Sequence, residues 1–282
     1  MTSKMIRNGI LGLSALALSM IPSKNVSAKV IDNYKINTEV SAYYSETAEG
    51  SMKMPGNGIK VYGNVDLSKN KFLGNIQIDA QKYSGDYSCD NSKIAGFDGN
   101  SCKVYLTGGY KFKSFSPKAG FAMDINKSNI NLTEAPISVN HQTNAYGFIL
   151  GTDYSIGKLN ASLEGIVKNG TVEDRTSGLS NIMNQYNLNG AEIKLSAEYV
   201  FNDKLGLKVE GSVEDINSDG KTISNKFGAK LWKVIKGIKA VVGLERVDIK
   251  KEGTQSIGNT YNAYVGVGMN FGGSKWKNYS YF

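Results

Sequence analysis

The chain has 282 residues, a formal net charge of +8 and a negative mean hydropathy of −0.29. Beyond the N-terminal segment, no stretch comes near the roughly 20 consecutive apolar residues that a membrane-spanning helix needs. A positive charge can indicate nucleic-acid binding. These lysines are scattered along the chain and form no basic cluster, so we expect no nucleic-acid partner.

The N-terminal segment has the pattern of an export signal. Lys4 and Arg7 precede an apolar run at 10–21, and residues 26–28 (Val-Ser-Ala) provide the small residues of a cleavage site. The apolar run is too short to cross a bilayer as a helix. We therefore predict a signal peptide over 1–28 that is removed after export through the inner membrane.

The rest of the chain is dominated by alternation of apolar and polar residues, which indicates strands with one apolar and one polar face. In 35–45, for example, Val40 and Ala42 lie on one face, and Glu39 and Ser41 lie on the other. Most of these segments have about the 9–11 residues that a tilted strand needs to cross the hydrocarbon core. We predict twelve strands, at 35–45, 59–67, 72–81, 103–112, 119–125, 144–154, 159–167, 192–201, 205–214, 223–232, 238–247 and 261–271.

The connections between these strands alternate in length. Short turns are expected at 68–70, 114–117, 155–158, 202–204 and 234–237, and longer loops at 46–57, 84–101, 127–142, 169–187, 215–221 and 249–259. Pro55, Pro117 and Pro136 all fall in these connections, as expected for a residue without an N–H donor. The pattern predicts one all-β domain over 29–271, a transmembrane antiparallel up-and-down β-barrel with short periplasmic turns and longer external loops. Residues 272–282 would form a periplasmic tail.

The last predicted strand carries a further pattern, with apolar or aromatic residues at alternate positions: Tyr261, Val265, Val267, Met269 and Phe271. Together with the signal peptide and the alternation, it makes the chain resemble the bacterial outer-membrane β-barrel proteins, the porin-like and surface-antigen group. The resemblance implies a place in the cell outer membrane of a Gram-negative bacterium, contact with outer-membrane lipid, and recognition of this strand by the outer-membrane assembly machinery. The chain departs from the pattern because it continues past Phe271, so we expect an internal signal.

The polar face of the strands carries charges of both signs in nearly equal number. A strongly ion-selective pore would show an excess of one sign, so we expect low selectivity. The expected lumen-facing charges are Lys60, Asp66, Asp79, Lys103, Lys111, Glu164, Glu192, Lys194, Glu198, Lys208, Glu210, Lys226, Lys230 and Glu245.

Two roles are compatible with such a barrel. Eight strands are filled by side chains and sixteen leave a clear channel, so twelve strands leave both an open and a plugged lumen as alternatives. The favoured role is a porin-like passive channel for small solutes. The alternative is a non-conducting surface antigen or adhesin that contacts a host-surface ligand through its external loops.

Lysines also gather in the predicted short turns and the tail, where Asp203 is the one acidic residue. These lysines have two possible roles: they form a basic rim against anionic phospholipid headgroups, or they only keep the turns soluble. The lysines are Lys69, Lys71, Lys113, Lys118, Lys158, Lys204, Lys233, Lys236, Lys275 and Lys277.

The two cysteines, Cys89 and Cys102, close a segment rich in Gly, Asp, Asn and Ser. In an exported protein such a pair is expected to form a disulfide, with two free thiols as the alternative.

No pattern indicates catalysis or a cofactor. The single histidine, His141, falls in a predicted external loop without a nucleophile motif, and a serine-type site needs an oriented histidine base. The acidic pairs Glu173-Asp174 and Asp215/Asp219 are of a kind common in loops. Asp86, Asp90 and Asp98 match no calcium-loop spacing. We expect no enzyme activity, metal or cofactor.

Overall fold

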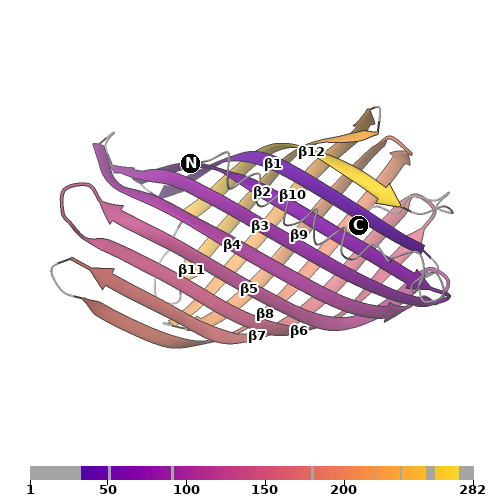
Figure 1. Ribbon diagram of the computed structural model, residues 1–282, viewed down its shortest axis with the longest axis horizontal. Helices are drawn as coiled ribbons and strands as arrows, with labels where there is room; N and C mark the ends of the chain where they lie inside the picture. The colour runs from indigo at the N-terminus through magenta and orange to yellow at the C-terminus, as the bar shows by residue number, and fades with distance from the viewer. Residues whose placement is uncertain are drawn as a thin grey trace, which may run out of the picture.

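The computed structural model describes residues 33–49, 52–89, 92–178, 181–218, 220–235, 237–251 and 258–272. The predicted signal peptide and residues 273–282 of the predicted tail lie outside this part. The described residues form twelve strands (Figure 1): β1 (Asn33–Glu49), β2 (Met52–Lys69), β3 (Phe72–Cys89), β4 (Ser92–Tyr110), β5 (Phe115–Leu132), β6 (Ser138–Ile156), β7 (Leu159–Ser177), β8 (Ile182–Asn202), β9 (Leu205–Ser218), β10 (Gly220–Ile235), β11 (Ile238–Lys251) and β12 (Gly258–Gly272).

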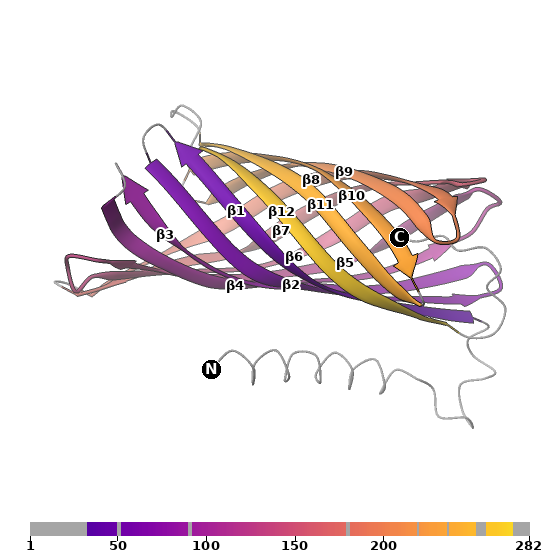
Figure 2. The ribbon, with the colours of Figure 1, turned by 90° about the horizontal axis from the view of Figure 1, so that it is seen from above.

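Every strand pairs antiparallel with its neighbours in sequence, and β1 pairs with β12 to close the barrel. The closing register runs from Lys35 opposite Gly272 to Ala48 opposite Asn259, and Figure 2 shows the two strands side by side. A closed barrel leaves no strand edge with unpaired N–H and C=O groups. The predicted twelve-stranded up-and-down barrel is confirmed.

No helix in the described part of the chain is long and apolar enough to cross a membrane.

The short turns lie near the predicted positions, except that the turn expected at 114–117 lies at 111–114, because β5 already begins at Phe115. Asn70 and Lys113 adopt positive φ angles of 54° and 51°, and Gly157 one of 57°. Tight hairpins favour such angles because their twist then matches that of the strands, and asparagine and glycine adopt them at low cost.

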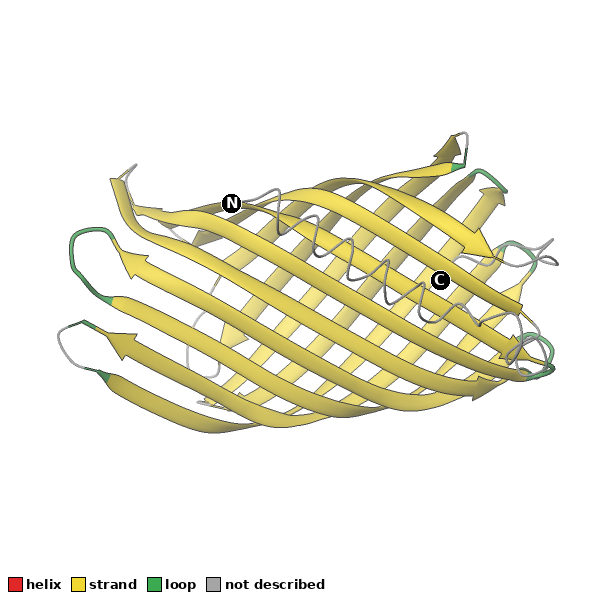
Figure 3. Cartoon of the chain, in the orientation of Figure 1, coloured by secondary structure: helices red, strands yellow, loops and turns green. Residues whose placement is uncertain are grey.

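The strands are longer than predicted, and most of the expected external loops are strand. The structure extends β3 to β8 to between 18 and 21 residues each. The segment expected as a loop at 84–101 forms the ends of β3 and β4, where Ser88 pairs with Lys93. Most outward residues there are polar because they lie beyond the lipid, with the exposed Ile94 as an exception. The alternation therefore fades while the strands continue (Figure 3).

The outward face of each strand changes from apolar to polar at one position. The exposed large apolar residues identify the outward face, and alternation along each strand assigns the others. The first outward polar residues form a ring, here called the polar collar: Glu46, Asn57, Lys82, Asn100, Lys127, Asn144, Asn169, Asn189, Asp215, Asn225, Arg246 and Asn259. The collar marks the external edge of the apolar band that faces lipid.

The barrel is taller on one side. Beyond the collar β3 continues over 83–89, β4 over 92–99 and β7 over 170–177, whereas β12 continues by Gly258 alone. The hairpins of β5–β6 and β7–β8 project at the left of Figure 1. We call the parts of β3 to β8 beyond the collar the external wall.

The expected disulfide between Cys89 and Cys102 does not form. Cys89 lies at the tip of β3 opposite Ser92, whereas Cys102 lies on β4 opposite Ala80. The stretch of β3 from Ala80 to Cys89 separates them by roughly 30 Å at about 3.3 Å per residue, and a disulfide needs Cα atoms within about 7 Å. The prediction was wrong because it treated 84–101 as a loop whose ends meet.

We expect reduced and non-reduced samples to migrate alike on a denaturing gel after heat unfolding, because no crosslink shortens the unfolded chain. A faster non-reduced band that disappears in the Cys102→Ser variant would contradict the β3–β4 register.

Val265, exposed at the middle of the outward face of β12, tests the position of the apolar band. Val265→Arg should lower the free energy of unfolding by about 2–4 kcal/mol, because it places a charge near the bilayer midplane. Asn259→Arg, on the same strand at the collar, should cost about 0–1 kcal/mol. Urea unfolding of both variants in lipid vesicles measures the difference, and equal costs would contradict the band.

Candidate functional site

Every second residue of each strand points into the lumen, and many of these residues are charged. Ten lysines and eleven carboxylates face inward between the collar and the periplasmic end. They are Lys35, Lys60, Lys103, Lys118, Lys168, Lys194, Lys208, Lys226, Lys230 and Lys239, with Glu39, Asp66, Asp79, Asp124, Asp153, Glu164, Glu192, Glu198, Glu210, Glu214 and Glu245.

The structure places thirteen of the fourteen predicted lumen charges on this inward face. Lys111 is the exception, because β4 ends at Tyr110 and Lys111 lies exposed in the following turn. Lys118, expected in a turn, lies inside β5 and contacts Asp153 at 2.6 Å and Glu164 at 2.7 Å. Lys35 is buried on the inward face of β1 and was not predicted. Both differences follow from strand ends that period-two alternation locates poorly.

Opposite charges face one another across neighbouring strands. Asp79 on β3 pairs in register with Lys103 on β4, which pairs with Asp124 on β5. The Lys103–Asp124 ion pair measures 3.1 Å, and Lys60 on β2 reaches Asp79 at 3.0 Å. Such cross-strand pairs stabilise a sheet, and here they neutralise the lumen wall.

One ion cluster is almost completely buried. The Lys168 ammonium on β7 lies 2.6 Å from Glu192 on β8 and 2.5 Å from Glu214 on β9. The side chains of Lys168 and Glu192 are 4% and 6% exposed. A buried charge is tolerated when it is paired, so each member depends on the others.

At mid-depth, side chains reach across the lumen. The Lys194 ammonium on β8 donates a hydrogen bond of 2.8 Å to the Tyr105 hydroxyl on β4 and lies 4.2 Å from that ring's centre. In the closed order of the barrel, the strands β5, β6 and β7 lie between β4 and β8. Because adjacent strands are about 4.8 Å apart, this contact must cross the interior.

A second contact also joins strands that are not neighbours. The Lys230 ammonium on β10 contacts Glu39 on β1 at 2.6 Å and lies 5.9 Å from the ring centre of Tyr62 on β2. The strands β12 and β11 separate β1 from β10. We call the contacts Lys194–Tyr105 and Lys230–Glu39 the mid-lumen bridge.

Apolar residues on the inward face pack beside the bridge. Tyr105 forms a buried cluster with Ala122, Ile149 and Ile166. Trp232 is buried with Val200 and Val241, and its indole N–H donates to Glu198 at 2.8 Å. These inward apolar residues narrow the lumen. They were missed, although the poor alternation of 223–232, which contains Trp232, was a signal of them.

Water access differs along the lumen. Lys60, Lys103 and Glu210, which lie between the collar and the bridge or level with it, keep 33%, 35% and 38% of their side-chain surface accessible. Towards the periplasmic end, Lys35 and Asn64 are buried. The part of the lumen between the collar and the bridge, here called the chamber, is therefore only partly water-accessible, since Lys168 and Glu192 near the collar are buried, and it leads to a layer packed with side chains.

His141 lies on β6, not in the expected loop. Its Nδ1 is 2.7 Å from Asp174 on β7, and its Nε2 is 3.1 Å from the Thr143 hydroxyl. The order carboxylate–imidazole–hydroxyl resembles a catalytic relay, but acyl transfer also needs N–H donors for an oxyanion. The N–H groups of these residues belong to the ladders of β6 and β7, so the three residues alone do not complete such a site.

The acidic residues considered for calcium do not gather. Asp86 pairs with Lys93 at 2.6 Å, Asp98 accepts a hydrogen bond from Asn129, and Asp90 lies outside the described residues. In the part of the chain that the structure describes, no three His, Cys, Asp or Glu side chains form a potential metal site.

The sequence matches no family model, and no curated protein matches it. Solved structures do. The COG4313 outer membrane channel from Pseudomonas putida F1 aligns with 10% identity over 89% of this chain and all of its own, at a TM-score of 0.55. The beta domain of the Bordetella autotransporter BrkA aligns with 9% identity over 85% of this chain and all of its own, at 0.54. This chain has the outer-membrane β-barrel fold.

The translocator domain of the autotransporter NalP from Neisseria meningitidis has the same fold, with 15% identity over 95% of this chain and 98% of its own and a TM-score of 0.50. At these identities the outer-membrane β-barrel fold is shared while the activities differ, since a channel and autotransporter domains both have it.

Lys168→Met should lower the free energy of unfolding by about 3–5 kcal/mol, because it leaves Glu214 without its cation and the buried Glu192 with Lys194 alone, at 3.6 Å. Lys93→Met is the matched control. It removes a lysine 2.6 Å from a carboxylate on the half-exposed external wall, where a pair contributes at most about 1 kcal/mol. Urea unfolding in vesicles compares them, and equal losses would contradict the buried cluster.

Proposed function

We propose that the protein is a passive channel for small solutes in the outer membrane, whose conductance is limited by the mid-lumen bridge. The observation that carries the proposal is the water-accessible, charged chamber that ends at a constriction made of side chains. Within the described residues, every group that meets at mid-depth comes from a barrel strand. The Lys194 and Lys230 side chains keep 27% and 22% of their surface accessible, so a rotamer change of these lysines would widen the constriction without movement of the backbone.

Low ion selectivity follows from the charge balance. The inward face carries ten lysines and eleven carboxylates, and ion pairs such as Lys60–Asp79, Lys103–Asp124 and Lys226–Glu245 join neighbouring strands. Selectivity requires a ring of one sign at the constriction, whereas the bridge contains Lys194 and Lys230 beside Glu39. Passive passage of solutes involves no catalytic step.

We also propose that the protein lies in the outer membrane. An apolar band ends at the polar collar, and the predicted signal peptide would provide export. Tyr261, Val265, Val267 and Met269 all lie exposed on the outward face of β12, where the outer-membrane assembly machinery and lipid would meet them. The side chain of Phe271 lies outside the described residues. At the periplasmic rim, Lys69, Lys71, Lys113, Lys158, Lys204 and Lys233 are exposed, as contact with anionic lipid requires.

Single-channel recording of the refolded protein in a planar bilayer tests the channel. We expect small, discrete steps and a reversal potential near zero in a salt gradient. The Lys194→Ala/Tyr105→Ala double variant should conduct several-fold more, because it removes one of the two cross-lumen contacts. The Lys93→Ala/Asp86→Ala control on the external wall should conduct like the wild type. Silence from folded wild type and from the folded bridge variant would contradict the proposal.

A second candidate function rests on the external wall. Its hairpin tips expose Ile94, Ile182 and Met183, and exposed apolar groups on a projecting surface are typical of protein contacts. A folded, silent barrel would favour this role as a surface antigen or adhesin that binds a host ligand.

A further inference from the structure

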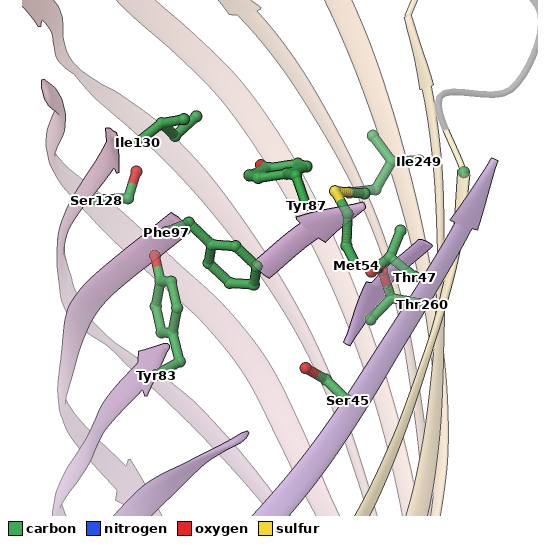
Figure 4. A pocket seen from close by; sticks show the side chains of 11 residues that line it. Ser45, Thr47, Met54, Tyr83, Tyr87, Phe97, Ser128, Ile130, Ile249 and Thr260 are labelled. Atoms are coloured by element: carbon green, nitrogen blue, oxygen red, sulfur yellow. Dashed lines mark hydrogen bonds between the residues drawn. The ribbon is translucent and has the colours of Figure 1, made fainter. Parts of the chain in front are cut away.

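A cavity of about 280 Å³ lies at the external mouth of the lumen, along the arc of strands that runs from β11 through β12, β1 and β2 to β5 (Figure 4). Tyr83, Tyr87 and Phe97 line it from β3 and β4, and Met54 and Ile249 line it from β2 and β11. None of its eleven lining residues is charged. The cavity therefore differs in chemistry from the charged chamber below it.

The aromatic side chains of the cavity form one cluster. The Phe97 ring centre lies 5.1 Å from that of Tyr87, at an interplanar angle of 62°, and 6.5 Å from that of Tyr83. Burial raises the pKa of both the Tyr83 and the Tyr87 phenols, so both hydroxyls stay neutral. The cluster presents aromatic surface without charge.

Glycines hold two of these rings against the barrel wall. Phe97 pairs in register with Gly85, and Tyr83 pairs with Gly99. A Cβ atom on Gly85 would meet the Phe97 ring, and one on Gly99 would meet the Tyr83 ring. A ring that lies over a glycine stabilises that glycine's strand position and leaves its opposite face towards the cavity.

Hydroxyl groups surround the rings. The Tyr83 hydroxyl donates to Asn126 at 3.2 Å. The Thr47 and Thr260 hydroxyls, 2.7 Å apart, lie on the opposite side, and Ser128 lies beside Tyr83 (Figure 4). Ligand sites commonly combine an apolar, aromatic lining with a few polar groups that orient the ligand.

From this lining we infer that the cavity binds an uncharged aromatic molecule of one or two rings that carries a hydroxyl group. The ring faces offer offset or edge-to-face stacking, and the hydroxyls offer hydrogen bonds to the ligand's own. An ion would lose hydration without gaining a partner, and the volume is too small for a long chain. The inference deepens the proposed channel, because it names the solute captured at its entrance.

Equilibrium dialysis of 2-naphthol against the refolded protein in lipid nanodiscs, with empty nanodiscs subtracted, tests the site. We expect saturable binding at one site per barrel, and none for naphthalene-2-sulfonate or glucose. Phe97→Ala should weaken binding about ten-fold, because it removes a stacking partner. Met54→Trp, which fills the cavity and retains the aromatic cluster, should weaken it as much.

The matched control removes a second aromatic pair. Phe121 and Phe148 lie 5.8 Å apart on the lipid face, and the Phe121→Ala/Phe148→Ala variant should bind like the wild type. Heat-modifiable migration on a gel shows that each variant is folded. Non-saturable uptake, or equal binding by the Phe97→Ala, Met54→Trp and lipid-face variants, would overturn the inference. Saturable binding by a barrel that does not conduct in planar bilayers would support the binding site and contradict the proposed channel.

Discussion

The pairing of β1 with β12 is the constraint on which the rest of this structure depends. In the hydrocarbon region no water is available for backbone N–H and C=O groups, so a sheet can cross the membrane only when both its edges are joined. Closure gives every strand one lipid face and one lumen face. The same alternation then places the apolar residues outside and collects twenty-one charged groups, ten lysines and eleven carboxylates, inside.

Those inward charges decide how much space a twelve-stranded barrel retains. Cations and anions on neighbouring strands pair along the wall, and some of these pairs stay partly water-accessible, as Lys60 and Asp79 do, whereas Lys168 and Glu192 are buried. Where long side chains meet from strands several positions apart, as Lys194 and Tyr105 do, they close the interior. The lumen is thus neither a clear pore nor a continuous core.

Beyond the collar the physical demands change. Without lipid, the outward residues of β3 to β8 are free to be polar, while the backbone ladder continues and raises the external wall. On the inner side of that wall, the glycines opposite Phe97 and Tyr83 leave room for the two aromatic rings beside the strands. The uncharged cavity therefore lies directly above a charged chamber, and a solute would meet the two environments in succession.

The strand count, the two faces of the strands and thirteen of the fourteen proposed lumen charges could be predicted from the sequence, because alternation along a strand is local and a membrane enforces it. The strand ends could not, so Lys111 and Lys118 were misplaced. Contacts between segments that lie far apart in the sequence could not be predicted either. The register of β3 and β4 keeps Cys89 away from Cys102, that of β6 and β7 brings His141 to Asp174, and closure brings Lys230 to Glu39. Such contacts depend on register and on barrel closure, which no local pattern encodes and only the tertiary structure decided.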